Sequence, residues 1–176
     1  LLAVRPGETV VDATFGAGGH ARLLAADLDG QGKYVAIDRD PDVRTYFDRF
    51  KGQAGPLQTR LLRGEFSIVL SQLAANDVKA DAILLDLGVS SMQVDRPERG
   101  FSYATDAPLD MRMDSTAELS ARNLVNEADE REHPRTIADV EFVVHETGQL
   151  AREPLLVPTR VAGGPEENGT LVVVHA

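Results

Sequence analysis

Residues 10–26 constrain the fold of this chain more than any other stretch. The stretch begins with β-branched residues that end at Asp12, passes through Gly16, Gly18 and Gly19, and continues with helical spacing. That order predicts a strand, a tight turn and the start of a helix. Glycines in such a turn let the backbone approach a ligand, and the helix start offers N–H donors and a positive dipole end. We therefore expect a nucleotide-like cofactor at this turn.

The glycine spacing alone leaves two cofactor classes open, because residues 16–21 also satisfy the loose dinucleotide pattern G-x-G-x-x-G/A. Two acids narrow the choice. Asp12 precedes the glycines, where it would receive a cationic amino acid group and repel a pyrophosphate. Asp38 ends the next apolar run, residues 34–37, where an acid can bind both hydroxyls of a ribose. Together they favour S-adenosylmethionine over a dinucleotide.

Further apolar runs alternate with helical patterns along the chain. We expect strands at residues 34–37, 57–62 and 80–87, and a helix that begins near Pro41. This alternation predicts an α/β fold with a doubly wound, mostly parallel sheet of the Rossmann-like kind. The length suits a single domain over residues 1–176.

Three of the predicted strands end in an acid, namely Asp12, Asp38 and Asp86. Ligands of such sheets lie beyond the carboxyl ends of the strands. A single acid at this place can equally cap a helix or form a turn. Three acids around one glycine turn indicate a binding site.

Residues 88–114 lose the hydrophobic period, although Phe101 and Tyr103 argue against disorder. An irregular segment of this length in a small domain is usually functional. We expect a lid or a substrate platform that follows the fourth strand.

Charged residues in and near that segment have two readings each. Asp110, Arg112 and Asp114 are expected to pair with one another, and substrate binding is the alternative. Arg96, Arg99 and Arg112 are the best candidates for phosphate contacts, and a solvated face is the alternative for each.

Composition excludes several classes of site. The chain has no cysteine, which rules out disulfides, thiolate metal ligands and a cysteine nucleophile, and its four histidines lack metal-ligand spacing, so we expect no metal. No stretch has membrane-spanning length and no leader is visible, so we expect a cytoplasmic location without membrane contact. Because the chain begins at Leu1, we expect that its natural start is missing.

The net charge of −10 opposes binding to nucleic acid, because phosphate contacts need Lys and Arg. If the substrate is RNA, the basic surface must be local or supplied elsewhere.

Four stretches carry a family pattern, at residues 12–20, 36–41, 84–93 and 98–114. They resemble the bacterial 16S ribosomal RNA cytosine-N4 methyltransferases of the MraW type, and the similarity extends from about residue 1 to 130. The resemblance implies a class I methyltransferase fold, S-adenosylmethionine as cofactor, and methylation of a cytosine N4 in 16S rRNA of the small ribosomal subunit. The cofactor-binding residues that it implies are Gly18, Gly19, His20, Asp38, Phe66, Asp86 and Gln93.

Three of these residues have a second reading. We expect His20 to cap the helix or to contact the cofactor carboxylate, rather than to act as a general base. Phe66 can stack on the adenine or pack in the core. Gln93 can orient the cofactor through its amide.

Methyl transfer to an exocyclic amine needs an acceptor beside the N–H as positive charge develops. Asp86 is the candidate for positioning the amine or accepting its proton, with cofactor contact as the lesser role. Ser90 and Ser91 are expected to assist.

The final third departs from the family pattern. The family has a helical insertion after the segment that resembles residues 121–126, and almost nothing stands in its place near residues 127–135. Either the insertion is deleted or the sequence joins segments across missing residues. Residues 169–175 resemble the family's fifth strand. The rival reading is a truncated module that binds S-adenosylmethionine without productive RNA methylation, and the oligomeric state stays open.

Overall fold

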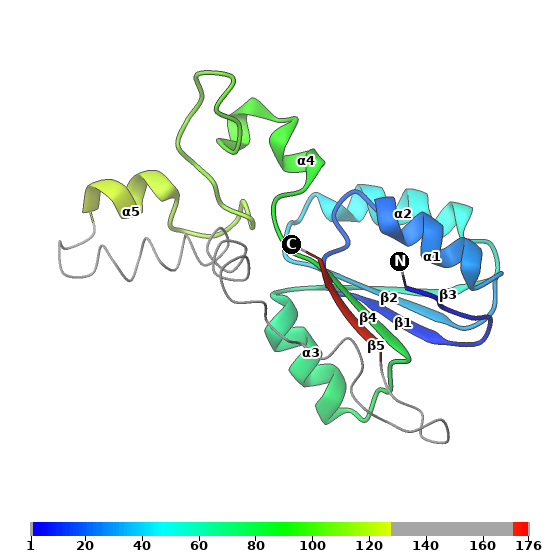
Figure 1. Ribbon diagram of the computed structural model, residues 1–176. Coiled ribbons are helices and arrows are strands. Elements are labelled where there is room, and N and C mark those ends of the chain that lie inside the picture. Colours follow the sequence, from blue (N-terminus) through cyan, green and yellow to red (C-terminus); the bar gives the residue numbers. More distant parts are fainter. Residues whose placement is uncertain (1, 128–170, 176) are drawn as a thin grey trace. The chain divides into compact units, whose positions relative to one another are not determined.

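The predicted strands form one parallel sheet. The computed structural model describes residues 2–127 and 171–175, and in it five strands lie in the order β3-β2-β1-β4-β5 (Figure 1). The strands are β1 (Thr9–Asp12), β2 (Lys33–Asp38), β3 (Gln58–Arg63), β4 (Ala82–Asp86) and β5 (Leu171–His175). The order reverses direction between β1 and β4, which confirms the Rossmann-like α/β fold. The fifth strand implied by the family resemblance is also confirmed.

Helices cover both faces of this sheet. Figure 1 shows α1 (Gly19–Asp27) and α2 (Val43–Gln53) on one face and α3 (Phe66–Ala75) on the other. Right-handed crossovers require this, because the chain runs outward from β1 to β3 and then returns past β1 to β4. The sheet is therefore doubly wound.

Each face of the sheet buries its own core. Under α1 and α2, the ring of Phe15 lies 5.6 Å from those of both Phe47 and Phe50, and Tyr34 lies 5.0 Å from Phe50. Edge-on and tilted aromatic contacts of this kind add to the burial of apolar area. The other face, against α3, is formed by Val11, Val35, Ile37 and Val69. Alternate residues of β1 and β2 thus point to opposite cores.

The chain divides into two units, one made of residues 1–86 and 156–175 and the other mainly of residues 87–155. The second unit contains α4 (Ser91–Val94), the 3₁₀ helix η1 (Pro97–Arg99) and α5 (Ala121–Glu127). Residues 88–114 are therefore irregular for most of their length, as the sequence predicts, but they contain two short helices that it does not predict. Helices of four and three residues are too short to show a hydrophobic period.

Arg99 connects η1 to residues 112 and 113 within the second unit. Its side chain is buried, and its Nη2 donates to the carbonyl oxygens of Arg112 at 2.8 Å and Met113 at 3.1 Å. The next residue, Gly100, has a φ of 73°, and a Cβ there would lie 2.4 Å from the carbonyl oxygen of Pro108. Burial makes Arg99 part of the framework, so the expectation that it contacts phosphate is wrong.

The expected pairing of Asp110 with Arg112 is confirmed. Nε and Nη2 of Arg112 donate to the two carboxylate oxygens of Asp110 at 2.9 and 2.6 Å. This hydrogen bonding lowers the pKa of Asp110. Asp114 accepts the backbone N–H and the hydroxyl of Thr116. The hydrogen bond to Asp110 raises the pKa of Arg112, and the charge of Asp114 adds to this effect. The arginine that remains exposed among the phosphate candidates is Arg96.

The place expected for the missing insertion, residues 127–135, falls outside the described residues apart from the backbone of residue 127. Within residues 2–127 and 171–175, no helix is long and apolar enough to cross a membrane.

Candidate functional site

Three strand ends meet where the order of the sheet reverses. β1, β2 and β4 are neighbours and parallel, so their terminal residues Asp12, Asp38 and Asp86 lie at the same edge of the sheet. The glycine turn that follows β1 lies at this edge as well, and it leads into α1. This is the place at which open α/β sheets bind ligands.

The glycine turn has a backbone that only glycine adopts easily. Gly16 and Gly18 have φ values of 53° and 76°. A Cβ at Gly18 would lie 2.9 Å from Cζ of Phe15, which is closer than real contacts allow. A Cβ at Gly19 would meet no atom within 4 Å. The turn is thus closed toward the core at Gly18 and open to a ligand at Gly19.

Asp38 ties the end of β2 to this turn. Its Oδ2 accepts the backbone N–H of Gly16 at 2.7 Å, and its Oδ1 accepts that of Asp40 at 2.9 Å. Burial raises the pKa of Asp38, and these N–H donors counter the effect. A carboxylate offers about four acceptor sites. Asp38 can therefore hold the turn and still accept from a hydroxyl.

Asp12 lies beneath the turn and is 1% exposed. The hydroxyl of Tyr34 donates to its Oδ2 at 2.7 Å, and the backbone N–H of Thr14 donates to its Oδ1 at 3.1 Å. Burial raises the pKa of Asp12 to about 6 against these two hydrogen bonds. The carboxylate of Asp12 is therefore occupied by groups of the protein, and its contact with a cationic ligand group stays a prediction.

Thr14 joins β1 to β4 through its side chain. Its Oγ1 accepts the backbone N–H of Asp86 at 2.8 Å. Neither Thr14 nor Tyr34 is among the predicted site residues. The place of Thr14 between a strand-end acid and a glycine only weakly indicates a role in the site. Tyr34 looks like an ordinary core residue of β2.

His20 and Asp86 form a pair at the exposed edge of the site. Nδ1 of His20, in the first turn of α1, lies 3.4 Å from Oδ2 of Asp86. The side chains are 46% and 35% exposed, so both can reach solvent or a ligand. The contact is an ion pair only when the imidazole is protonated. A carboxylate beside an imidazole can accept a proton and pass it on.

Phe66 begins α3 and is half-buried. It packs against the core cluster that contains Val35 and Ile37. Core packing therefore accounts for part of the ring, and the stacking of its exposed part on an adenine stays a prediction.

The remaining predicted site residues belong to the second unit. Ser90 and Gln93 form a capping box at the start of α4, in which Oε1 of Gln93 accepts the backbone N–H of Ser90 at 3.0 Å. Gln93 is buried and Ser91 is exposed. The capping accounts for Gln93 as a structural residue. Its predicted contact with the cofactor, and the roles of Ser90 and Ser91, stay predictions.

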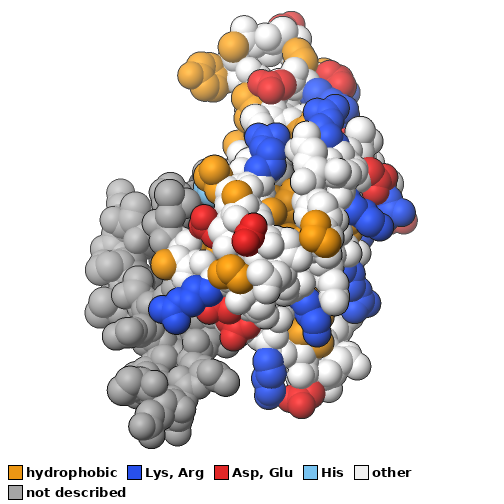
Figure 2. Space-filling view, turned by 90° about the vertical axis from the view of Figure 1, so that its right-hand side faces the viewer, with side chains coloured by type: hydrophobic (Ala, Val, Ile, Leu, Met, Phe, Trp, Pro, Cys, Tyr) orange, Lys and Arg blue, Asp and Glu red, His pale blue; other side chains and the backbone are white. Residues whose placement is uncertain are grey.

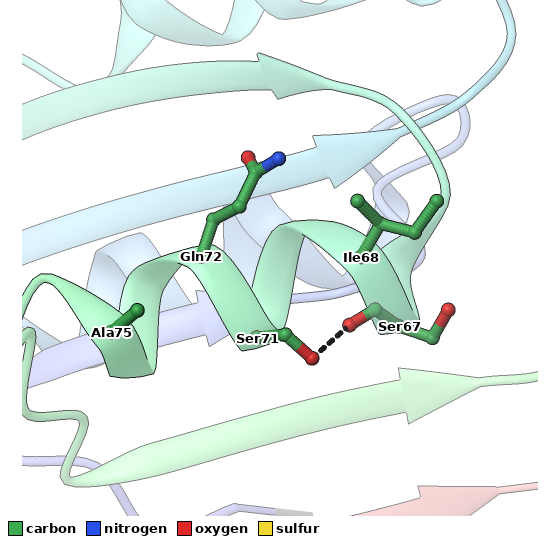
Figure 3. Close-up of a pocket in the computed structure, with 5 residues that line it drawn as sticks. All are labelled: Ser67, Ile68, Ser71, Gln72 and Ala75. Carbon is green, nitrogen blue, oxygen red and sulfur yellow. Dashed lines mark hydrogen bonds between the residues drawn. The ribbon is translucent and has the colours of Figure 1, made fainter.

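A separate hollow of about 450 Å³ lies along the outer side of α3 (Figure 3). Its lining residues are Ser67, Ile68, Ser71, Gln72 and Ala75. The hydroxyl of Ser71 is engaged, because it donates to the carbonyl oxygen of Ser67 at 2.8 Å. None of its described lining residues is charged, so it suits a nucleotide-like cofactor less well than the strand ends do. Among the described residues, no group of His, Asp and Glu is arranged to hold a metal.

Comparison with known proteins extends over most of the chain. The sequence pattern of the MraW methylase family matches residues 1–141. Curated relatives named ribosomal RNA small subunit methyltransferase H are similar to the chain. The one from Rubrobacter xylanophilus is 41% identical over 86% of this chain and 45% of its own length. The one from Mycolicibacterium gilvum is 47% identical over 77% of this chain and 36% of its own length. The one from Methylibium petroleiphilum is 40% identical over 93% of this chain and 51% of its own length. The chain thus spans about half, or less, of the length of these relatives.

Proposed function

Because the chain belongs to the MraW methylase family, we propose that it is an S-adenosylmethionine-dependent methyltransferase of the exocyclic N4 of a cytosine in 16S ribosomal RNA. The observation that carries the proposal is the set of three strand-end aspartates around a glycine turn whose backbone is open at Gly19. The names of the relatives support RNA of the small ribosomal subunit as substrate. Such a substrate would place the protein in the cytoplasm.

The residues present fit S-adenosylmethionine. The carboxylate of Asp38 would accept from the ribose hydroxyls while it holds Gly16. The open backbone at Gly19 and the start of α1 would receive the carboxylate of the methionine part, because N–H groups there have no partner within the helix. Phe66 and Gln93 are proposed as further contacts to the cofactor. When bound, S-adenosylmethionine supplies a methyl group on a positively charged sulfur.

Asp86 is the proposed catalytic residue. The N4 of cytosine is a poor nucleophile because its lone pair is delocalised into the ring, so alignment and charge stabilisation must supply the rate. A carboxylate at the end of β4, 35% exposed, can hold the amino group and accept its proton as positive charge develops on the nitrogen. His20, whose Nδ1 lies 3.4 Å from Oδ2 of Asp86, is proposed to contact the carboxylate of the cofactor. Ser90 and Ser91 are proposed to assist, and the target base must leave its stack.

The alternative is a module that binds S-adenosylmethionine without productive RNA methylation. The net charge of −10 favours it, because phosphate contacts need Lys and Arg. A nicotinamide enzyme rests only on the glycine spacing of residues 16–21.

Two variants test the two parts of the proposal, methyl transfer and cofactor binding. Asp86→Asn keeps the size of the side chain but removes its charge, so transfer of labelled methyl to small ribosomal subunits should slow by about 10²-fold or more. Asp38→Ala removes the acceptor for two hydroxyls, so binding of S-adenosylmethionine in calorimetry should fall below detection, since hydrogen bonds to charged groups contribute about 1.5–3 kcal/mol each. Asp86→Asn should bind the cofactor more tightly than Asp38→Ala does.

The same measurements can refute each part. Binding of NAD in place of S-adenosylmethionine would contradict the cofactor assignment. Binding of S-adenosylmethionine without any methyl transfer by the parent protein would favour the binding module. Normal single-turnover rates with a collapsed cofactor affinity in Asp86→Asn would make Asp86 a binding residue only.

A further inference from the structure

A side-chain hydrogen bond extends the pairing of β1 with β4 beyond the last backbone hydrogen bond between them. The backbone ladder between the two strands continues to the N–H of Ala13, which donates to the carbonyl oxygen of Leu84 at 2.9 Å. Beyond it, the acceptor for the N–H of Asp86 is a side chain, the Oγ1 of Thr14, at 2.8 Å. Asp86, the last residue of β4, therefore donates its N–H toward β1 to the hydroxyl oxygen of Thr14.

Thr14 is itself held by buried groups. Its backbone N–H donates to Oδ1 of Asp12 at 3.1 Å, and Oδ2 of Asp12 accepts the hydroxyl of Tyr34 at 2.7 Å. Asp12 and Tyr34 are 1% and 0% exposed, so this part of the network has little freedom to shift. The chain of contacts runs from β2 through β1 to β4. It gives the hydroxyl of Thr14 a fixed place from which to hold Asp86.

We infer that Thr14 is a positioning residue for methyl transfer. Its hydroxyl oxygen fixes the backbone of Asp86 and thereby holds the Asp86 carboxylate beside the acceptor amine. The inference rests on the proposed function, because it takes Asp86 as the residue that meets the amine. Misplacement by about 1 Å costs a large part of a catalysed rate, so one lost backbone contact is enough to be measured. A purely structural threonine would affect stability, but not turnover at saturating substrate.

Three variants separate these roles. Thr14→Val has nearly the same shape but no oxygen, and Thr14→Ser keeps the oxygen and loses a methyl group. Thr59→Val is the matched control, because Thr59 is a half-buried threonine of β3, the edge strand away from β4. Thr14→Ala serves if Thr14→Val does not fold. All four substitutions are made in the same protein that is used in the methyl-transfer assay.

Hydrogen exchange tests the contact directly. The amide of Asp86 should exchange about tenfold faster in Thr14→Val than in the parent, since that is the effect of losing one hydrogen bond. Exchange at the parent rate in Thr14→Ser and in Thr59→Val is expected. An unchanged rate in Thr14→Val would overturn the inference, and this result does not depend on whether the parent transfers methyl groups.

Steady-state kinetics test the role in catalysis. In Thr14→Val, kcat for labelled methyl transfer should fall about tenfold or more, while the KM for S-adenosylmethionine changes less than about threefold. Thr14→Ser should restore kcat. A parental kcat in Thr14→Val, or a loss that Thr14→Ser fails to restore, would overturn the inference. A parent protein that transfers no methyl at all would instead refute the proposed function, and the exchange rates would still decide the contact.

Discussion

At the scale of single residues, the three strand-end acids do different work. Asp38 holds Gly16 and remains accessible, and Asp86 faces outward beside His20. Asp12 is buried and is kept by Tyr34 and Thr14. A carboxylate in this place carries a cost, because burial disfavours its charged form more than the two hydrogen bonds favour it.

The buried acid predicts a specific dependence of stability on pH. The pKa of Asp12 is raised from 3.8 to about 6 in the folded protein, so the unfolded chain loses this proton first as pH rises. The proton on Asp12 therefore stabilises the folded protein fully below about pH 4, and this stabilisation is lost as pH rises through about 6. Asp12→Asn lacks this dependence. We therefore expect the unfolding free energy of Asp12→Asn, relative to the parent, to increase by about 2 kcal/mol between pH 4 and pH 7.

Denaturant unfolding at a series of pH values measures this difference. Tyr34→Phe is the informative control, because it removes a hydrogen bond that lowers the pKa of Asp12. In Tyr34→Phe the loss of stability should continue to a higher pH. A difference between Asp12→Asn and the parent that stays flat from pH 4 to pH 7 would contradict the assignment.

At the scale of elements, the turn between β1 and α1 uses its glycines for two different reasons. Gly18 is required by its backbone, which is left-handed and packed against Phe15. Gly19 is the first residue of α1, and the space beside it is open. One glycine serves the fold, whereas the other leaves room for a ligand.

This distinction predicts opposite results for two alanine variants. Gly18→Ala should lower the unfolding free energy by at least about 1 kcal/mol, since a left-handed backbone is unfavourable for alanine even before the contact with Phe15. Gly19→Ala should raise it by about 0.5–1 kcal/mol, because alanine is the better helix residue. The same Gly19→Ala should weaken binding of S-adenosylmethionine about tenfold or more, because its Cβ occupies the open space. Thermal unfolding and calorimetry check both effects, and unchanged affinity in Gly19→Ala would place the ligand elsewhere.

At the scale of the whole molecule, charge limits how this chain can meet RNA. The net charge is −10. On the face shown in Figure 2, Lys and Arg side chains are interspersed with Asp and Glu and do not gather in one patch. Of the arginines considered for phosphate, Arg99 is buried and Arg112 is paired with Asp110. Of these three arginines, Arg96 is the exposed one.

Binding of this chain to single-stranded RNA should therefore depend little on salt. Each neutralised phosphate contributes about −0.7 to the slope of log affinity against log salt. We expect a slope no steeper than about −2, corresponding to roughly three contacts or fewer. Titrations at several salt concentrations measure it. A steeper slope would show that the chain carries a basic groove of its own.

The local features of this protein can be predicted from its sequence. The strand, glycine turn and helix of residues 10–26, the alternation that produces a parallel sheet, and the three acids at strand ends all follow from neighbouring residues. Local sequence suffices for them because strand and helix periods, and the backbone freedom of glycine, act over a few residues. For the same reason the two short helices within residues 88–114 were missed, since each contains about one turn.

Which side chains contact one another cannot be predicted in this way, because it depends on the folded arrangement of the strands. Tyr34 reaches Asp12 across 22 residues, and Thr14 reaches Asp86 across 72, because β1 lies between β2 and β4 in the sheet. Strand order and register set these contacts, and no spacing within the sequence contains them. Burial is decided in the same way: Arg99 and Asp12 are charged residues that the sequence places at the surface or at a ligand, and packing encloses both. The physical reason is that hydrogen bonds and desolvation depend on distance in space, which the chain acquires only when it folds.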